Sequence, residues 1–401
     1  MRANLTFKVL FFILLFVFSL VACEKIMPAS PNDDELLDGP VDGLTHAQSL
    51  QHLRGDVAFN DQIFSAETGL GPVFVATSCG SCHAGDGKGH PFTTLTRFGQ
   101  TDSTGNQFLE QGGPLLQNRA LPGFKPEQIP FGATYAKFTP PIASGLGFLE
   151  LVSDADILAM SDPNDVDGDG ISGVPNWNFI PSYINPNANA IKQGGKYICK
   201  LGKKASVYNL LQQTVTAYNQ DIGITSVFNP LDVYSLKEID PEIPTNTVHD
   251  VVFYLQTLKT PIQRNQNDAT VQYGKNIFTQ IGCVSCHKPT LKTGFSNIES
   301  LSNKEFHPYT DLLLHKMGGN LAEDYTEGNA KNDEWRTAPL WGLGLAKVSQ
   351  GGDYFLLHDG RAKSIEEAIA YHGGEASSRR DNYYALSEND KNALLKFLQS
   401  L

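Results

Sequence analysis

Two stretches of the chain repeat apolar residues at the spacing of one helical face. Val248–Leu258 and Asn389–Leu401 both place apolar side chains at i, i+3, i+4 and i+7, and their last eight residues correspond position by position. Pro261 follows the first stretch as a helix stop, and Ser387 precedes the second as an N-cap. The pattern predicts an amphipathic helix that closes each half of the chain.

The two halves share two further elements in the same order. A short amphipathic helix is predicted at Phe59–Phe64 in the first half and at Tyr273–Phe278 in the second. A segment rich in proline and glycine comes next, Thr139–Gly147 in the first half and Thr337–Gly344 in the second, with one extra residue in the first copy. The chain is therefore expected to be mainly α and to contain two related domains.

The first half is longer because it carries a loop-rich insertion, which includes a predicted helix at Ala205–Asn219. We expect one domain at residues 48–262, insertion included, and a second at residues 263–401. A chain of 401 residues has room for two such domains, since a domain takes about 150 residues.

Four of the six cysteines belong to a motif that occurs twice. Cys79–His83 and Cys283–His287 both have the pattern C-x-x-C-H. Two thiols at this spacing can bond to the vinyl groups of one haem, and the adjoining histidine then lies under the iron as its proximal ligand. A zinc site would not explain the histidine in both copies, and a thioredoxin-like motif needs a βαβ unit that is not evident. We predict two covalently bound c-type haems, held by Cys79, Cys82, His83, Cys283, Cys286 and His287.

The amino terminus has the pattern of a bacterial export signal. The apolar run Val9–Ala22 follows a basic start and is too short to cross about 30 Å of hydrocarbon as a helix. It ends at Cys23 in a pattern that resembles a lipobox, whose cysteine becomes lipid-modified; an ordinary signal peptide with a chance cysteine is the alternative. We expect a signal peptide at 1–22, a lipidated polar tether at 23–47, and anchoring in the cell envelope facing the periplasm or cell surface.

An acidic loop lies in the insertion. Asp165, Asp167 and Asp169 alternate in the pattern D-x-D-x-D-G, and Gly170 permits a sharp turn. The bidentate glutamate of a full EF-hand is missing, since Asn176 occupies its position. We predict a calcium site, and a solvated acidic turn is the alternative. Its ligands would come from Asp165, Asp167, Asp169, Ile171 and Gly173.

Charge and the remaining cysteine limit other functions. Lys and Arg total 31 against 43 Asp and Glu, which gives a formal charge of −12. We expect no binding to nucleic acid, because phosphate contacts need clustered cationic side chains. An acidic chain is instead suited to a basic redox partner of the cytochrome or cupredoxin type. Cys199 has no partner left, and we expect a buried free thiol.

These motifs resemble those of the bacterial di-haem oxidoreductases. Besides the two C-x-x-C-H segments, Glu334–Gly342 and His358–Ala368 are similar to that family, and in particular to its branch of thiol oxidoreductases. Residues 308–318 and 371–376 are also similar to that branch, and the likeness extends over residues 50–401. The resemblance implies two cytochrome c-like domains that face each other, with electrons passing between the haems.

One departure from that family leaves the sixth ligand of the second haem open. In the related di-haem peroxidases a methionine just ahead of the proline segment ligates the electron-transfer haem, whereas this chain has Glu334 there. Met317 is the first candidate, because it lies in a glycine-flanked loop and a thioether raises the haem potential. Its rivals are an open site and three histidines, His315, His358 and His372.

Two functions are compatible with these motifs. The first is a peroxidase-like oxidoreductase in which one haem reacts with peroxide or an oxidisable substrate and the other relays electrons. The second is a non-enzymatic lipoprotein that carries electrons through two six-coordinate haems. The segments that resemble peroxidase haem pockets contain polar residues that could assist acid–base chemistry, or else cap helices and cover the surface. These candidate catalytic residues are Glu150, His358, Arg361 and Glu367.

Overall fold

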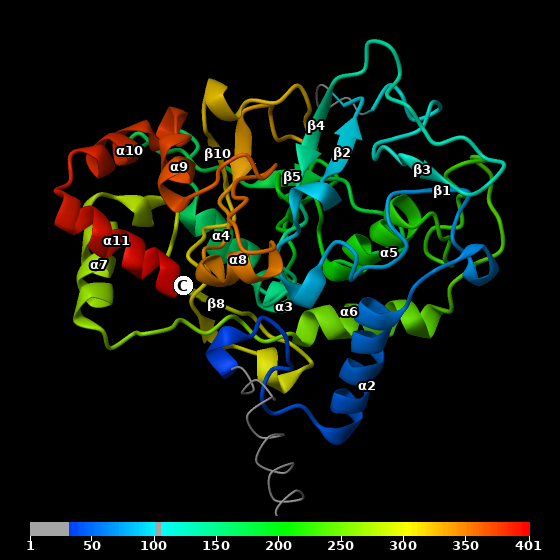
Figure 1. The fold of residues 1–401 in the computed structure, drawn as a ribbon, viewed down its shortest axis with the longest axis horizontal. Helices are drawn as coiled ribbons and strands as arrows, with labels where there is room; N and C mark the ends of the chain where they lie inside the picture. The colour runs from blue at the N-terminus through cyan, green and yellow to red at the C-terminus, as the bar shows by residue number, and fades with distance from the viewer. Residues whose placement is uncertain (1–31, 101–105) are drawn as a thin grey trace, which may run out of the picture. The chain divides into compact units, whose positions relative to one another are not determined.

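Each half of the chain is built around a crossed pair of helices. In the computed structural model, which describes residues 32–100 and 106–401, α2 (His46–Asp56) packs on α6 (Thr245–Thr257) in the first half. In the second half α7 (Ala269–Gln280) packs on α11 (Glu388–Ser400), and Figure 1 shows these two helices side by side. Both predicted closing helices are confirmed, and Ser387 accepts a hydrogen bond from the Asp390 amide as the expected N-cap.

A glycine lets the helices of each pair approach closely. A Cβ atom at Gly55 of α2 would lie 2.1 Å from the carbonyl oxygen of Asp250 in α6. A Cβ atom at Gly274 of α7 would lie 2.0 Å from the carbonyl oxygen of Ala393 in α11. Because no side chain tolerates such distances, only glycine fits at either crossing.

The two proline- and glycine-rich segments dock on the closing helices in the same way. Gly147 in α3 (Leu146–Glu150) lies against the carbonyl oxygen of Gln256, and Gly344 lies against that of Gln399. Added Cβ atoms would come within 2.0 and 1.9 Å of these oxygens. Since both the glycines and the glutamines hold matching places in the two halves, the internal repeat predicted from the sequence is reproduced in the packing.

The helix predicted at Phe59–Phe64 is observed at an earlier position, as α2 and the turn that follows it. Helix α2 begins after Thr45, whose side chain accepts a hydrogen bond from the Gln48 amide, and it continues as a turn of π-helix at Val57–Asp61. The backbone is extended from Gln62, so the apolar residues up to Phe64 leave the helix before the first C-x-x-C-H segment.

The helix of the insertion is shorter at its start than predicted. Helix α5 runs over Leu210–Asp221, with Asn209 as its N-cap. Ala205 has a φ of +48°, which a right-handed helix cannot contain, so the predicted start at that residue is wrong.

Short antiparallel sheets accompany these helices and were not predicted. The strand pairs are β1 with β3, β2 with β4, β8 with β9 and β10 with β11, and β7 lies between β5 and β6. The strands are β1 (Val73–Phe74), β2 (Leu95–Phe98), β3 (Arg119–Ala120), β4 (Tyr135–Phe138), β5 (Asn176–Asn178), β6 (Lys192–Gln193), β7 (Lys196–Cys199), β8 (Leu291–Lys292), β9 (Glu305–Phe306), β10 (Leu314–Lys316) and β11 (Glu334–Arg336). The other helices are α4 (Asp154–Met160), α8 (Ala346–Ser349), α9 (Ile365–Ala370) and α10 (Ser377–Tyr384).

The larger hydrophobic core draws residues from both halves. It surrounds α5 and α6 of the first half, yet it also contains Phe306 and Trp341 of the second half. A separate core lies between α7 and α11, where Phe278 meets Phe397. Residues 37–401 form one compact unit, and the predicted domain boundary after residue 262 stays a prediction.

The predicted export signal and lipid site, including Cys23, lie outside the described residues. Of the segment up to Leu36, residues 32–36 are described, and they contain a single 3-10 turn at Asp33–Glu35. No helix within residues 32–100 and 106–401 has the length and apolar character needed to cross a membrane.

Replacing Gly274 by alanine should destabilise the protein, because the added methyl group would meet the Ala393 carbonyl oxygen. We expect the free energy of unfolding to fall by roughly 1–3 kcal/mol, the usual cost of overpacking, as measured by urea denaturation. Gly319→Ala is the matched control, since a Cβ atom there has no neighbour within 4 Å. Equal stability of the two variants would contradict the role given to the crossing.

Candidate functional site

The second C-x-x-C-H segment lines a partly open cavity. The 3-10 turn at Cys283–Ser285 follows α7 directly, so the two thiols and His287 are presented at the end of that helix. They line a cavity of about 300 Å³ whose walls are mostly apolar. The cavity brings together eight of the site residues predicted from the sequence, which are Ile171, Cys283, Cys286, His287, His315, Met317, His358 and His372.

His287 is held in the state that an iron ligand requires. Its Nδ1 lies 2.9 Å from the carbonyl oxygen of Tyr309, which can only accept, so Nδ1 carries the proton. Burial lowers the pKa of His287 to about 4, which keeps the ring neutral and leaves a lone pair on Nε2. Metal-binding histidines are commonly oriented by such a partner on the other ring nitrogen.

His372 has the same arrangement at the same cavity. Its Nδ1 lies 2.8 Å from the carbonyl oxygen of Ala368, and burial lowers the pKa of the ring. Its Nε2 therefore also carries a lone pair. His372 is close enough to His287 that a charge on it would lower the pKa of His287.

The other two histidine candidates are already engaged. Nε2 of His358 lies 2.8 Å from Glu323, and Nε2 of His315 lies 2.9 Å from Asp311. Met317 lines the cavity and packs against the hydrophobic cluster around Trp335. Met317 and His372 thus remain the candidates for a sixth ligand, and neither assignment goes beyond a prediction.

The first C-x-x-C-H segment is surrounded much like the second. The ring centroids of Phe59 and His83 lie 5.8 Å apart, and Phe59 packs on Tyr254 of α6 at 5.5 Å. In the second half the corresponding distances are 6.3 Å from Phe278 to His287 and 5.4 Å from Phe278 to Phe397. An aromatic pair therefore stands beside each predicted proximal histidine.

The cysteines and His83 fit covalently attached haems. None of the described cysteines forms a disulfide, and burial raises the pKa of Cys79, Cys82 and Cys283 to about 12, so their thiols stay neutral. Burial likewise lowers the pKa of His83 to about 4, and its Nδ1 is buried without a hydrogen-bond partner in the described part of the chain. Cys199 is a buried free thiol, as expected.

His358 and Arg361, two of the predicted catalytic residues, belong to one polar cluster. The ring of His358 stacks on Trp335 at 3.9 Å with the planes 14° apart. Its Nε2 faces Glu323, and Arg361 pairs with both Glu323 and Asp359. Burial lowers the pKa of His358, so the ring can take up a proton and release it again. Trp335 and Asp359 lie inside the family-like segments, whereas no sequence signal marked Glu323.

The other two predicted catalytic residues lie away from this cavity. The carboxylate of Glu150 accepts hydrogen bonds from the Leu210 amide at 2.7 Å and from the Gln256 side chain at 3.1 Å. Glu367 lies in the first turn of α9, where its carboxylate accepts a hydrogen bond from the Lys363 amide. Both contacts are structural, and a catalytic role for either residue stays a prediction.

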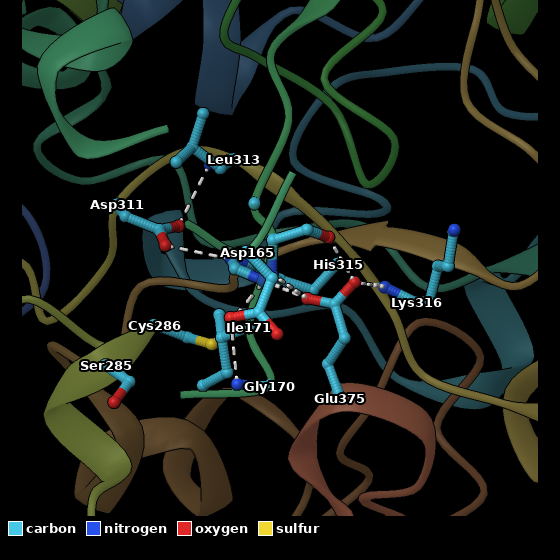
Figure 2. A network of polar contacts seen from close by, with 12 residues as sticks. Asp165, Gly170, Ile171, Ser285, Cys286, Asp311, Leu313, His315, Lys316 and Glu375 are labelled. Carbon is cyan, nitrogen blue, oxygen red and sulfur yellow. Dashed lines mark hydrogen bonds and ion pairs between the residues drawn. The ribbon is translucent and has the colours of Figure 1, made fainter. Parts of the chain in front are cut away.

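A buried histidine joins the second C-x-x-C-H segment to the insertion. Figure 2 shows His315 between the carboxylates of Asp311 and Glu375, each 2.9 Å from a ring nitrogen, with the Cys286 sulfur 3.6 Å from Nδ1. Burial alone would lower the pKa of His315, but its hydrogen bonds to Asp311, Cys286 and Glu375 raise it well above the ordinary value. His315 is therefore an imidazolium held by two carboxylates.

Glu375 carries this network to the acidic loop. Its carboxylate accepts hydrogen bonds from the Ser172 hydroxyl at 2.6 Å and from the Ser172 amide at 3.1 Å. Burial would raise the pKa of Glu375, but the hydrogen bonds from His315 and Ser172 lower it to about 2. The acidic loop is thus tied to the second C-x-x-C-H segment through Glu375 and His315.

The acidic loop turns as its sequence predicts, but the three carboxylates that lie close together are not the three that the motif predicts. Gly170 has a φ of +82°, and its amide donates to Asp165 at 3.0 Å. The carboxylates close enough to share a cation are those of Asp162, Asp165 and Asp167. Asp169 pairs with Arg379 at 2.8 Å, and the Gly173 carbonyl accepts a hydrogen bond from Ser161. Asp162, which precedes the D-x-D-x-D-G motif, was missed.

Comparison with known proteins identifies similar sequences and structures. Residues 133–401 match the family model described as "Di-haem oxidoreductase, putative peroxidase". The sequence matches no curated protein. The chain is similar to the diheme peroxidase BthA from Burkholderia thailandensis, with 14% identity and a TM-score of 0.41 over 88% of this chain and 86% of that chain.

Two further solved structures are similar. Hydrazine synthase from Kuenenia stuttgartiensis has 12% identity and a TM-score of 0.37, over 94% of this chain and 98% of that chain. A MauG-like protein associated with microbial copper homeostasis has 13% identity and a TM-score of 0.32, over 65% of this chain and 89% of that chain. All three TM-scores lie below 0.5, which is too low to establish a shared fold.

Replacing Glu375 by glutamine should destabilise the protein in a pH-dependent way. The folded-state pKa of Glu375 lies below its ordinary value of 4.5, so its contribution to stability is present above pH 4.5 and is lost as the pH falls toward 2. The folded-state pKa of His315 lies above 6.5, so its contribution is full below pH 6.5 and declines as the pH rises through the raised pKa. The loss should therefore be largest between about pH 4.5 and 6.5, at roughly 1.5–3 kcal/mol.

Urea denaturation of the parent and the variant across this pH range measures the difference. Glu305→Gln, which removes an exposed carboxylate of β9, is the matched control and should change little at any pH. A loss that does not vary with pH would contradict the ionic link between His315 and Glu375.

Proposed function

Because the chain belongs to the di-haem oxidoreductase family, we propose that it is a peroxidase-like enzyme that carries two covalent c-type haems. The haems, when bound, supply the redox chemistry: one reacts with peroxide or an oxidisable substrate and the other relays electrons. The observation that carries the proposal is the cavity where Cys283, Cys286 and His287 meet the acid–base cluster of His358.

The polar cluster would supply the proton transfers. Glu323 holds the His358 ring at Nε2, and Trp335 fixes the ring plane by stacking. Burial would raise the pKa of Glu323, but its contacts with His358 and Arg361 lower it, which keeps that carboxylate ionised and able to orient the histidine. A buried histidine with a lowered pKa is suited to hold and release a proton during cleavage of an O–O bond.

A specific observation favours the alternative of a non-enzymatic electron carrier. His287 and His372 both offer an Nε2 lone pair to the same cavity, so both could ligate the iron of a haem bound there. The thioether of Met317, which also lines the cavity, could take the place of His372 as the second ligand. A second haem closed in this way could only relay electrons, so the proposed enzyme requires that the second haem stay open beside His358.

Further parts of the proposal rest on the sequence. Export through residues 1–22 and lipid attachment at Cys23 would hold the protein in the cell envelope, facing the periplasm or the cell surface. The net charge of −12 favours a basic cytochrome or cupredoxin as electron donor. Calcium would bind the acidic loop, where Asp162, Asp165 and Asp167 repel one another without a cation.

The function is tested on the haem-loaded protein. The alkaline pyridine haemochrome assay should give two covalent haems per chain, and the ferric spectrum should show one high-spin haem. His358→Gln should lower the rate of peroxide reduction by about 10²–10⁴-fold, the usual contribution of a general acid–base group. His307→Gln, which alters an exposed histidine, should leave the rate unchanged. Two low-spin haems with no peroxide reaction would establish the carrier instead.

Removal of calcium should lower the melting temperature. At a calcium concentration about 100-fold above Kd, binding stabilises the folded state by about 2.7 kcal/mol. Asp162→Asn and Asp167→Asn should weaken binding and make melting insensitive to chelator, whereas Asp353→Asn, an exposed change outside the loop, should behave like the parent. A parent melting curve that chelator leaves unchanged would show that the loop is a solvated acidic turn.

A further inference from the structure

Three cationic side chains from separate parts of the chain line the cavity of the second C-x-x-C-H segment. Lys88 follows the first C-x-x-C-H segment, Lys203 lies in the insertion, and Arg336 is the last residue of β11. None of them forms an ion pair with a carboxylate of residues 32–100 or 106–401. The fold thus gathers three positive groups around an apolar space and supplies no negative partner for them.

Backbone contacts fix Arg336 and Lys203 beside each other. The Arg336 amide donates to the Lys203 carbonyl oxygen at 3.1 Å, and Arg336 Nε donates to the Gly202 carbonyl oxygen at 2.8 Å. These bonds direct the guanidinium, yet its Nη1 is buried and has no hydrogen-bond partner in the described part of the chain. Burying a cationic donor without a hydrogen-bond acceptor costs free energy. The unpaired Nη1 therefore indicates that a ligand supplies the missing acceptor.

The charges of the three side chains oppose one another. Burial and the neighbouring Arg336 lower the pKa of Lys203 to about 8, and burial and Lys203 lower the pKa of Lys88 well below its ordinary value. The carboxylates that act on these cations are Asp359, on both lysines, and Asp311, on Arg336, and both are already engaged. Their partners are Arg361 at 2.7 Å and His315 at 2.9 Å, respectively.

We propose that Lys88, Lys203 and Arg336 form a carboxylate-binding cluster that receives haem propionates. The proposal rests on the haem content proposed above, because the propionates are the carboxylates that such a cofactor brings into the cavity. Arg336 is suited to this role, since a guanidinium fork matches a carboxylate in two parallel hydrogen bonds. Lys88 follows the first C-x-x-C-H segment along the chain yet lines the cavity of the second, so the cluster includes residues next to both predicted haem segments.

A free carboxylate from solution offers the same chemistry, and the test separates the two sources. The haem-loaded parent, Arg336→Gln and Lys203→Gln are compared with Arg336→Lys, which keeps the charge without the fork. Lys292→Gln removes an exposed lysine of β8 and serves as the matched control. The haemochrome count is measured first, so that loss of haem, which would overturn the proposed function, is distinguished from failure of the cluster.

With two haems per chain, we expect the propionate bending band in the resonance Raman spectrum to shift in Arg336→Gln and Lys203→Gln. The midpoint potential of at least one haem should fall, because loss of a nearby cation favours the oxidised form. Arg336→Lys should shift both readouts less, and Lys292→Gln should shift neither.

Titration with acetate tests whether the cluster binds a free carboxylate from solution instead of a haem propionate. A saturable spectral response in the parent that Arg336→Gln abolishes, with the Raman band unchanged, would keep the cluster as a carboxylate site but assign it to a free carboxylate. An unchanged Raman band and potential in both variants, with no saturable response to acetate, would overturn the proposal.

Discussion

The close crossing of two helices in each half is the constraint on which the rest of the structure depends. Gly55 and Gly274 bring a backbone carbonyl to a distance that no side chain permits, and this sets the position of α2 on α6 and of α7 on α11. The second C-x-x-C-H segment starts at the end of α7, so the crossing determines where its thiols and His287 point. Gly147 and Gly344 then dock the following segments on the same closing helices.

The cavity combines neutral candidate ligands with charged surroundings. His287 and His372 are kept neutral by burial and by backbone carbonyl partners, whereas His315 is kept charged by two carboxylates. Histidine thus has two roles at this cavity, neutral candidate ligand or charged structural group, and the partners of its ring nitrogens decide which. Electrostatics, more than position in the sequence, separates candidate ligands from structural groups here.

The sequence predicted the elements whose signal is local. The C-x-x-C-H motifs and the closing helices depend on residues within one or two turns, and the repeat aligned Gly147 with Gly344 before any contact was known. The strands span two to four residues, too few for an alternating pattern to appear. Glu323 and Lys203 were missed because their partners, His358 and Arg336, lie far away along the chain, and no spacing rule connects such residues.

The shared core has a consequence for the order of events during synthesis. A chain made from its amino terminus exposes Cys79 and His83 long before Trp341, yet Trp341 belongs to the core that surrounds α5 and α6. The first half cannot complete its packing until most of the second half has been made. Its C-x-x-C-H segment therefore stays accessible to modifying enzymes for longer than a self-contained domain would allow, while the core between α7 and α11 closes as soon as the carboxyl terminus emerges.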